Sequence, residues 1–214
     1  MALKLNVSLL RPEDAPLVLA AEVVQAGGMI VYPTETLYGI GTNAFNAQAV
    51  DKVHSVKKRT EGKPMLVIIP VVESLHGMVE EITVSAQQLI DAFWPGPLTL
   101  VFTATANVPE NLTQRSGTIG IRIPSSAFCR RLLSLCGCPL TSTSANISGG
   151  MVLSTVEEIQ NVLGTGVDLY LDAGVLPESK PSTVVDVTGT RPRLLREGAI
   201  SFEHIRQVTT NIQR

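Results

Sequence analysis

Two arginines lie inside apolar segments that have the character of β-strands. Arg122 belongs to the segment TIGIRIP, and Arg196 belongs to LLREG. A half-buried arginine needs an anionic partner, and its planar guanidinium binds carboxylate or phosphate through paired hydrogen bonds. A plainer interpretation stays open, in which each arginine sits on an edge strand and points into water. The two positions are therefore candidate anion-binding residues.

Three segments rich in short polar side chains could complete such a site. They are YPTETLYG at 32–39, TSTSANISGG at 141–150 and KPSTVVD at 180–186. Hydroxyl groups and backbone N–H groups above a glycine turn can bind phosphate. The same residue types also cap turns and helices without any ligand.

A basic segment adds positive charge near the middle of the chain. Between Asp51 and Lys63 there are five lysines or arginines and two acidic residues. Cations at the end of a helix complement its dipole and are ordinarily solvated, so this cluster alone does not require a ligand. Together with the strand arginines and the hydroxyl segments, it favours an anionic substrate held electrostatically.

The usual constellations of catalytic residues are missing from the sequence. The three histidines, His54, His76 and His204, are scattered, and there is no GxSxG or GxxxxGK[ST] motif. The segment from Gly39 to Ala44 fits GxGxxA, but it begins seven residues after the expected strand that ends near Tyr32. A dinucleotide site needs its glycines in the turn directly after the strand, so this match does not predict one.

Composition limits the class of protein. The chain has 214 residues, a formal net charge of −2 and 44% hydrophobic residues, enough to bury a core as a single domain over 1–214. The small net charge disfavours generic nucleic-acid binding. The three cysteines lack CxxC spacing, and the chain has neither a signal pattern nor a long apolar run. We therefore expect a soluble cytoplasmic protein with no membrane partner.

Helical and strand patterns alternate along the chain. Helices are expected at 12–26, 46–58, 85–93, 127–135, 155–163 and 202–212, and strands at 29–32, 65–69, 98–103, 118–123, 139–143, 167–171, 183–187 and 194–196. This alternation predicts an α/β fold, a twisted mixed β-sheet with helices packed on it. Short connections predict antiparallel pairing of 98–103 with 118–123 and of 183–187 with 194–196. Such a fold places the polar segments at strand ends, where ligand sites are commonly built.

In combination, six motifs resemble the YrdC-like family, the threonylcarbamoyl-AMP synthases that begin threonylcarbamoyladenosine formation in tRNA. They are YPTETLYGIG, the KxR of Lys57 and Arg59, IGIRIP, SAN at 144–146 with Ser148-Gly149, PSTVVD and LLREG. The resemblance runs from about residue 15 to 198 and implies a core over that span, a C-terminal helix at 202–212 and a concave active-site face. It implies that L-threonine, bicarbonate or CO2, and ATP are condensed with release of pyrophosphate, assisted by Mg²⁺.

The resemblance also implies roles for individual residues. Threonine would be bound by Thr36, Arg122, Ser142 and Ser182, and ATP by Arg59, Lys63, Thr118, Ser144, Asn146 and Arg196. Lys57 and Arg59 would be the catalytic residues of the signature that they form with Ser144 and Asn146. No side chain is expected to hold Mg²⁺, which would arrive on the ATP phosphates. A downstream threonylcarbamoyl-transferase complex and tRNA are candidate partners.

Two other functions fit part of the pattern. The basic segment at 51–63 would suit a non-catalytic RNA-binding module, although the near-neutral net charge argues against broad affinity. Carbamoyl transfer to another acceptor, as in the hydrogenase-maturation proteins that carry a YrdC-like domain, is opposed by the short chain and the absence of zinc-finger cysteines. The chain also departs from many YrdC-like proteins at Ile68, where they have histidine, and at Lys63, where they often have asparagine.

Overall fold

The strands of the protein form two mixed sheets, as seen in a computed structural model that describes residues 2–58, 65–177 and 179–214. Sheet A contains, in spatial order, β1 (Leu3–Asn6), β9 (Leu169–Asp172), β2 (Ile30–Pro33), β3 (Tyr38–Gly41) and β8 (Thr143–Ser144). Sheet B contains β11 (Arg193–Arg196), β10 (Thr183–Asp186), β5 (Leu98–Thr103), β6 (Thr118–Arg122), β4 (Leu66–Ile68) and β7 (Leu140–Thr141). The α/β class with mixed pairing is confirmed, but the strands are divided between two sheets, where one was expected.

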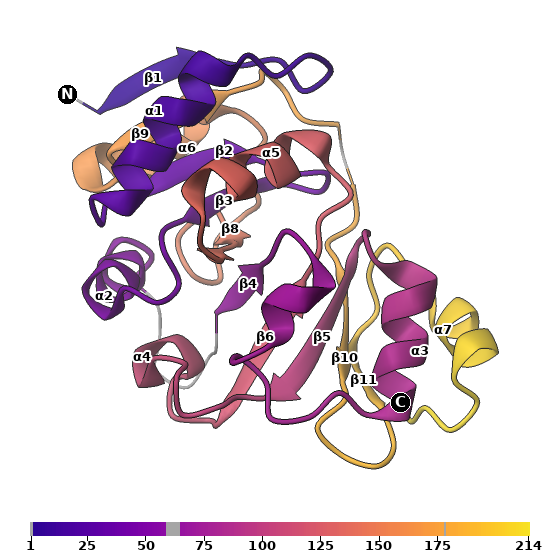
Figure 1. Cartoon of the computed structure of the whole chain (residues 1–214). Helices are drawn as coiled ribbons and strands as arrows, with labels where there is room; N and C mark the ends of the chain where they lie inside the picture. Colours follow the sequence, from indigo (N-terminus) through magenta and orange to yellow (C-terminus); the bar gives the residue numbers. More distant parts are fainter. Residues whose placement is uncertain (1, 59–64, 178) are drawn as a thin grey trace.

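The helices cover the outer faces of the two sheets (Figure 1). Against sheet A lie α1 (Asp14–Gln25) and α5 (Ala127–Cys136), which pack together in one apolar cluster with β2 and β9. Against sheet B lie α3 (Val84–Phe93) and α7 (Phe202–Val208). The remaining helices are α2 (Ala47–Val56), α4 (Glu110–Thr113) and α6 (Val156–Leu163), with short 3₁₀ turns at Val72–Leu75 and Gly164–Gly166. No helix in the described part of the chain is long and apolar enough to cross a membrane.

Side chains alternate between the two faces of sheet B. On β5, Leu98, Leu100 and Phe102 are buried in the apolar cluster that includes α3 and α7. The residues between them, Thr99 and Val101, face the other way and line a cavity. Because successive strand residues point to opposite faces, the helices stabilise one face while the opposite face of the same strands stays open for a ligand.

The chain passes from sheet B to sheet A at a single residue, Ser142. It separates β7, which pairs with β4, from β8, which pairs with β3. The Ser142 N–H donates to the carbonyl oxygen of Leu66 at 2.7 Å, which holds the junction against β4. The single strand expected at 139–143 is therefore two short strands in different sheets.

Several expected elements have different bounds, and some short ones were missed. The antiparallel pairs β5–β6 and β10–β11 are confirmed. The elements β1, β3 and α4 carried too little periodicity to be predicted. The C-terminal helix ends at Val208, not at residue 212, because Thr209 is extended and Gln213 pairs with the β11 segment through hydrogen bonds to Pro192 and Leu194.

The two glycines of Gly39-Ile40-Gly41 make room for a buried tyrosine. Both lie within β3, away from any strand-to-helix turn. The ring of Tyr32, which is fully buried, lies against them, so that a Cβ added at Gly41 would be 2.6 Å from Tyr32 Cε1. The Tyr32 hydroxyl donates to the carbonyl oxygen of Thr141 at 3.3 Å, next to the junction residue. The GxGxxA match is therefore a packing feature of sheet A.

We predict that Gly41→Ala lowers the free energy of unfolding by about 1–3 kcal/mol, because the new methyl group displaces a buried ring in a packed core. Equilibrium urea unfolding measures this change. The matched control is Gly120→Ala on β6, where a Cβ would make an ordinary 3.4 Å contact with Thr99. The control should retain its stability or gain up to about 1 kcal/mol. Equal losses in the two variants would contradict the packing role of Gly41.

Candidate active site

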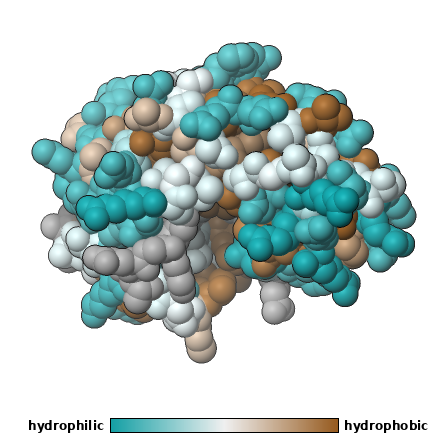
Figure 2. All heavy atoms as spheres, turned by 90° about the horizontal axis from the view of Figure 1, so that it is seen from below, coloured by the Kyte–Doolittle hydropathy of each residue, from teal (hydrophilic) through white to brown (hydrophobic). Residues whose placement is uncertain are grey.

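A cavity of about 760 Å³ lies between the open face of sheet B and the loops at the edge of sheet A. Figure 2 shows a hollow on this side of the molecule, with hydrophobic atoms deep inside it and hydrophilic residues around it. Ligand pockets of enzymes commonly have volumes of roughly 300–1,000 Å³. The cavity is lined by the predicted site residues Thr36, Thr118, Arg122, Ser142, Ser144, Asn146, Ser182 and Arg196. The structure therefore brings together residues that are up to 160 positions apart in the chain.

Three predicted residues are placed differently or cannot be placed. Arg59 and Lys63 lie outside the described residues. Lys57 is not among the residues that line the cavity, and its side chain is buried. The roles assigned to these three residues stay predictions.

Arg122 is the last residue of β6 and is only 3% exposed. Its Nη1 atom lies 3.5 Å from Oε1 of Glu35, which belongs to the turn between β2 and β3. The strand arginine thus has the anionic partner that its burial requires, and this partner comes from the other sheet. The ion pair thus links the end of β6 to the turn between β2 and β3.

Arg196, the last residue of β11, is held by hydrogen bonds. Its Nε and Nη2 atoms donate to the carbonyl oxygen of Ser182 at 3.1 and 2.8 Å, and Nη2 also donates to the Ser182 hydroxyl at 3.2 Å. That hydroxyl lies 3.0 Å from the Thr99 hydroxyl. Burial and the positive charge of Arg122 both lower the pKa of the Arg196 guanidinium. Two cations therefore face one cavity, which favours an anionic ligand.

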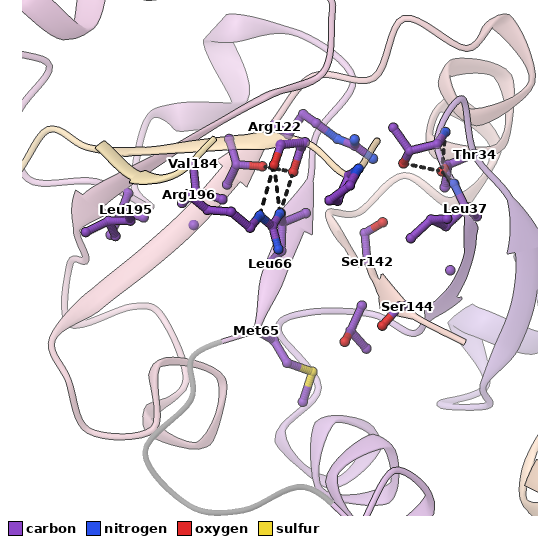
Figure 3. A pocket seen from close by; sticks show the side chains of 18 of the residues that line it. Thr34, Leu37, Met65, Leu66, Arg122, Ser142, Ser144, Val184, Leu195 and Arg196 are labelled. Atoms are coloured by element: carbon purple, nitrogen blue, oxygen red, sulfur yellow. Dashed lines mark hydrogen bonds between the residues drawn. The ribbon is translucent and has the colours of Figure 1, made fainter. Parts of the chain in front are cut away.

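The turn that carries Thr36 is rigidly hydrogen-bonded. The Thr34 hydroxyl accepts from the N–H groups of Thr36 and Leu37, both at 3.1 Å, and donates to the Leu37 carbonyl oxygen at 2.6 Å. From the loop after β9, the Ser179 hydroxyl donates to the carbonyl oxygen of Thr36. Figure 3 shows Thr34 and Leu37 across the cavity from Leu195 and Arg196. The hydroxyl segment at 32–39 is therefore both a turn and a wall of the cavity.

Lys57 anchors the loop that follows β8. Its ammonium group donates to the carbonyl oxygens of Ser144 and Asn146, the latter at 2.7 Å. Its own carbonyl oxygen accepts from the N–H of Ser148 at 2.9 Å. Lys57 is only 1% exposed, and its positive charge is stabilised by the backbone carbonyl dipoles of the SAN segment. This removes it from any solvated basic patch at 51–63.

Internal hydrogen bonds also shape the SAN segment. The Ser144 hydroxyl donates to Oδ1 of Asn146 at 2.6 Å. The amide nitrogen of Asn146 donates to the carbonyl oxygens of Gly150 and Met151 at 2.7 and 3.1 Å. These hydrogen bonds of Asn146 hold the loop 144–151 in one conformation beside the cavity. The conformation of the loop is therefore set before a ligand binds.

The cavity has further walls that sequence reasoning did not assign. They include the acid Asp186, the hydroxyl of Thr99, and the apolar residues Met65, Val101, Val184 and Leu195. Alternation along β5 and β10 could have found four of them, because Thr99 and Val101 share a face with Val184 and Asp186. Glu35 was missed because its importance depends on a contact with Arg122, 87 positions away.

The side chains around the cavity offer little acid–base or nucleophilic chemistry. None of the described residues that line it is a histidine, cysteine or lysine, and the described residues contain no group of three metal-ligating side chains. The thiol of Cys129 donates to the carbonyl oxygen of Pro33, and burial raises its pKa to about 12. The described part of the site can bind and orient anions, and its serine and threonine hydroxyls have no histidine or lysine among the described lining residues to activate them.

Comparison with known proteins assigns the family. The family model for Sua5, YciO and YrdC proteins, which carries the description "Telomere recombination", matches residues 22–198. The chain belongs to this family. The resemblance that the motifs indicated is therefore confirmed.

Two sequence relatives cover most of the chain. A protein of Mycobacterium tuberculosis strain H37Rv, provisionally named as a threonylcarbamoyl-AMP synthase, is 38% identical over 192 residues, which are 90% of this chain and 88% of the relative. The threonylcarbamoyl-AMP synthase of Vibrio vulnificus is 32% identical over 179 residues, which are 83% of this chain and 95% of the relative.

A solved structure shares the fold over the full chain. Sua5 of Pyrococcus abyssi in complex with L-threonine superposes with a TM-score of 0.92 at 31% identity, over 100% of this chain and 62% of Sua5. The chain thus spans less than two thirds of that protein. The likeness confirms the arrangement of sheets and helices around the cavity.

We predict that Lys57→Met lowers the free energy of unfolding by at least about 2 kcal/mol, because two buried carbonyl groups lose a charged donor. Urea unfolding checks this, independently of any activity. Lys52→Met is the matched control on α2, because Lys52 is exposed and donates to the carbonyl oxygen of Gly27 at 3.1 Å. A stability change in Lys57→Met no larger than in the control would show that the anchor is not needed.

Proposed function

We propose that the chain is a threonylcarbamoyl-AMP synthase, which condenses L-threonine, bicarbonate or CO2, and ATP and releases pyrophosphate. The observation that carries this proposal is the pair of guanidinium groups, Arg122 and Arg196, that face one hydroxyl-lined cavity. The names of the mycobacterial, Vibrio and Pyrococcus relatives support it, as does the threonine complex of Sua5.

The proposed reaction does not require a nucleophilic side chain of the protein. The amine of threonine adds to CO2 and loses protons to give a carbamate. A carbamate oxygen then attacks the α-phosphorus of ATP, and the bond from that phosphorus to the pyrophosphate oxygen breaks. Both reactants are anionic, so the barrier consists largely of positioning and charge repulsion. Cations held in fixed positions orient the two anionic reactants and reduce the repulsion between them.

The length of β6 suggests how the cavity is shared by the substrates. Arg122 and Thr118 stand at opposite ends of this strand, about 13 Å apart at the usual rise per residue. Arg122 would bind the threonine carboxylate, with Thr36, Ser142 and Ser182 around it. Thr118 and the SAN loop would bind ATP at the other end. Arg196, on the β11 side, would face the reacting phosphate.

Mg²⁺ would enter as part of the MgATP substrate. The one acidic side chain among the described lining residues is Asp186, whose Oδ1 already accepts from the N–H and hydroxyl of Thr188. Its Oδ2 lies 3.3 Å from Nη2 of Arg193. These contacts leave no protein cage for the cation, which fits a metal carried by the triphosphate.

The product would be passed to a threonylcarbamoyl transferase that modifies tRNA. A non-catalytic RNA-binding role is less favoured, because Lys57 is buried and does not contribute to a basic surface at 51–63. The anionic ligand that fits this hydroxyl-lined cavity of about 760 Å³ is a small molecule.

The proposal is tested by incubating the purified protein with MgATP, bicarbonate and labelled L-threonine. We expect a threonine-dependent adenylate together with an equal amount of pyrophosphate, and neither product when threonine or bicarbonate is omitted. Chromatography of the labelled adenylate and a coupled pyrophosphate assay measure the two products. Absence of both from a folded protein that binds ATP would overturn the proposal.

We further predict that Arg122→Lys raises the KM for threonine by about tenfold or more, because an ammonium group keeps the charge but loses the planar fork that matches a carboxylate. The KM for ATP should change by less than about threefold. Arg131→Lys on the surface of α5, where Arg131 pairs with Asp14, is the control and should resemble the wild type. A similar rise in both KM values would instead assign Arg122 a general structural role.

A further inference from the structure

Glu35 carries a carboxylate that is almost without partners. Both of its oxygen atoms are buried, and neither accepts a hydrogen bond from the described residues. Its oppositely charged neighbour is Arg122, whose Nη1 atom lies 3.5 Å from Oε1 of Glu35. A buried carboxylate without hydrogen bonds is energetically unfavourable unless a nearby cation compensates it. The position of Glu35 thus depends on Arg122.

Arg122 is held by the same ion pair and by little else. Its Nε is also buried without a hydrogen-bond partner among the described residues. Arg196 differs, because three hydrogen bonds to Ser182 hold its guanidinium. Glu35 compensates the charge of Arg122 without using its donors in hydrogen bonds. The guanidinium keeps those donors for a ligand.

The attraction of Glu35 for Arg122 opposes the repulsion between two arginines. Arg122 and Arg196 repel each other across the cavity, which is one reason that the pKa of Arg196 is lowered. Glu35 does not line the cavity, whereas Arg122 does. The Glu35 carboxylate therefore attracts the Arg122 guanidinium from a position outside the cavity. Its other close ionisable neighbours, Tyr32 and Cys129, are kept neutral because burial raises the pKa of each.

We propose that Glu35 is a positioning residue that holds the Arg122 guanidinium against the repulsion of Arg196, with its free donors directed at the carboxylate of the amino-acid substrate. This inference rests on the proposed function, because it concerns the threonine end of the same site. Glu35 touches neither substrate, and it acts only through Arg122. Loss of its charge should therefore weaken threonine binding more than ATP binding.

The test compares Glu35→Gln with the wild type in the adenylate assay. Glutamine keeps the size of the side chain and removes the charge. We expect the KM for threonine to rise about tenfold, since an arginine that is no longer held loses one well-oriented charged contact. The KM for ATP should stay within about twofold when each variant is assayed well below its own melting temperature. Glu22→Gln, on the exposed side of α1, is the control variant.

A double-mutant cycle then separates positioning from a structural role. If Glu35 acts through Arg122, Glu35→Gln adds no further rise in the threonine KM when it is combined with Arg122→Ala, which removes the charge that Glu35 pairs with. An unchanged or lower threonine KM in Glu35→Gln would overturn the inference, as would fully additive effects in the cycle. An inactive wild type would overturn the proposed function. An active wild type with an unaffected Glu35→Gln variant would overturn only the role of Glu35.

Discussion

The placement of two positive charges beside one cavity is the constraint on which the rest of the site depends. The guanidinium groups of Arg122 and Arg196 face the same cavity. The carboxylate of Glu35, which does not line that cavity, compensates part of their charge. Such an arrangement is stable only if each charge is fixed, because a free guanidinium would move out to water. Strand ends, a locked turn and a hydroxyl pair provide that fixation. One carboxylate offsets only part of the positive charge of the two arginines, and an anionic ligand would offset the rest.

The fold supplies this fixation by using the two faces of sheet B for different purposes. One face buries leucine, isoleucine and phenylalanine side chains beneath α3 and α7. The other face presents threonine, serine, arginine and small apolar residues to the cavity. The rigidity of the apolar face therefore transfers directly to the polar face, because the same strands carry both. The SAN loop is fixed separately, by a buried lysine whose charge satisfies backbone carbonyls.

Much of this structure could be predicted from local patterns. The helices with clear start signals were placed to within two residues, for example α2, where Asn46 accepts from the N–H of Ala49 as an N-cap. Most of the polar segments were correctly expected to gather at strand ends. The division into two sheets was not predictable, because it depends on which distant strands pair. The short strand β3 escaped because two of its four residues are glycine, which is depleted in strands. The ion pair of Glu35 with Arg122 and the inward turn of Lys57 escaped because neither has a local signal.

The single-residue junction at Ser142 bears on how this fold can be inherited. Sheet A contains strands from the beginning of the chain and from its second half, and sheet B contains strands from the middle and the end. A genetic exchange within 66–144 would join pieces whose partner strands come from different parents. Insertion of a residue beside Ser142 would shift β7 or β8 out of register with its neighbour. We expect homologous chains to diverge in length at the surface loops, while this junction keeps its spacing. The two sheets are therefore expected to be inherited together, as one unit.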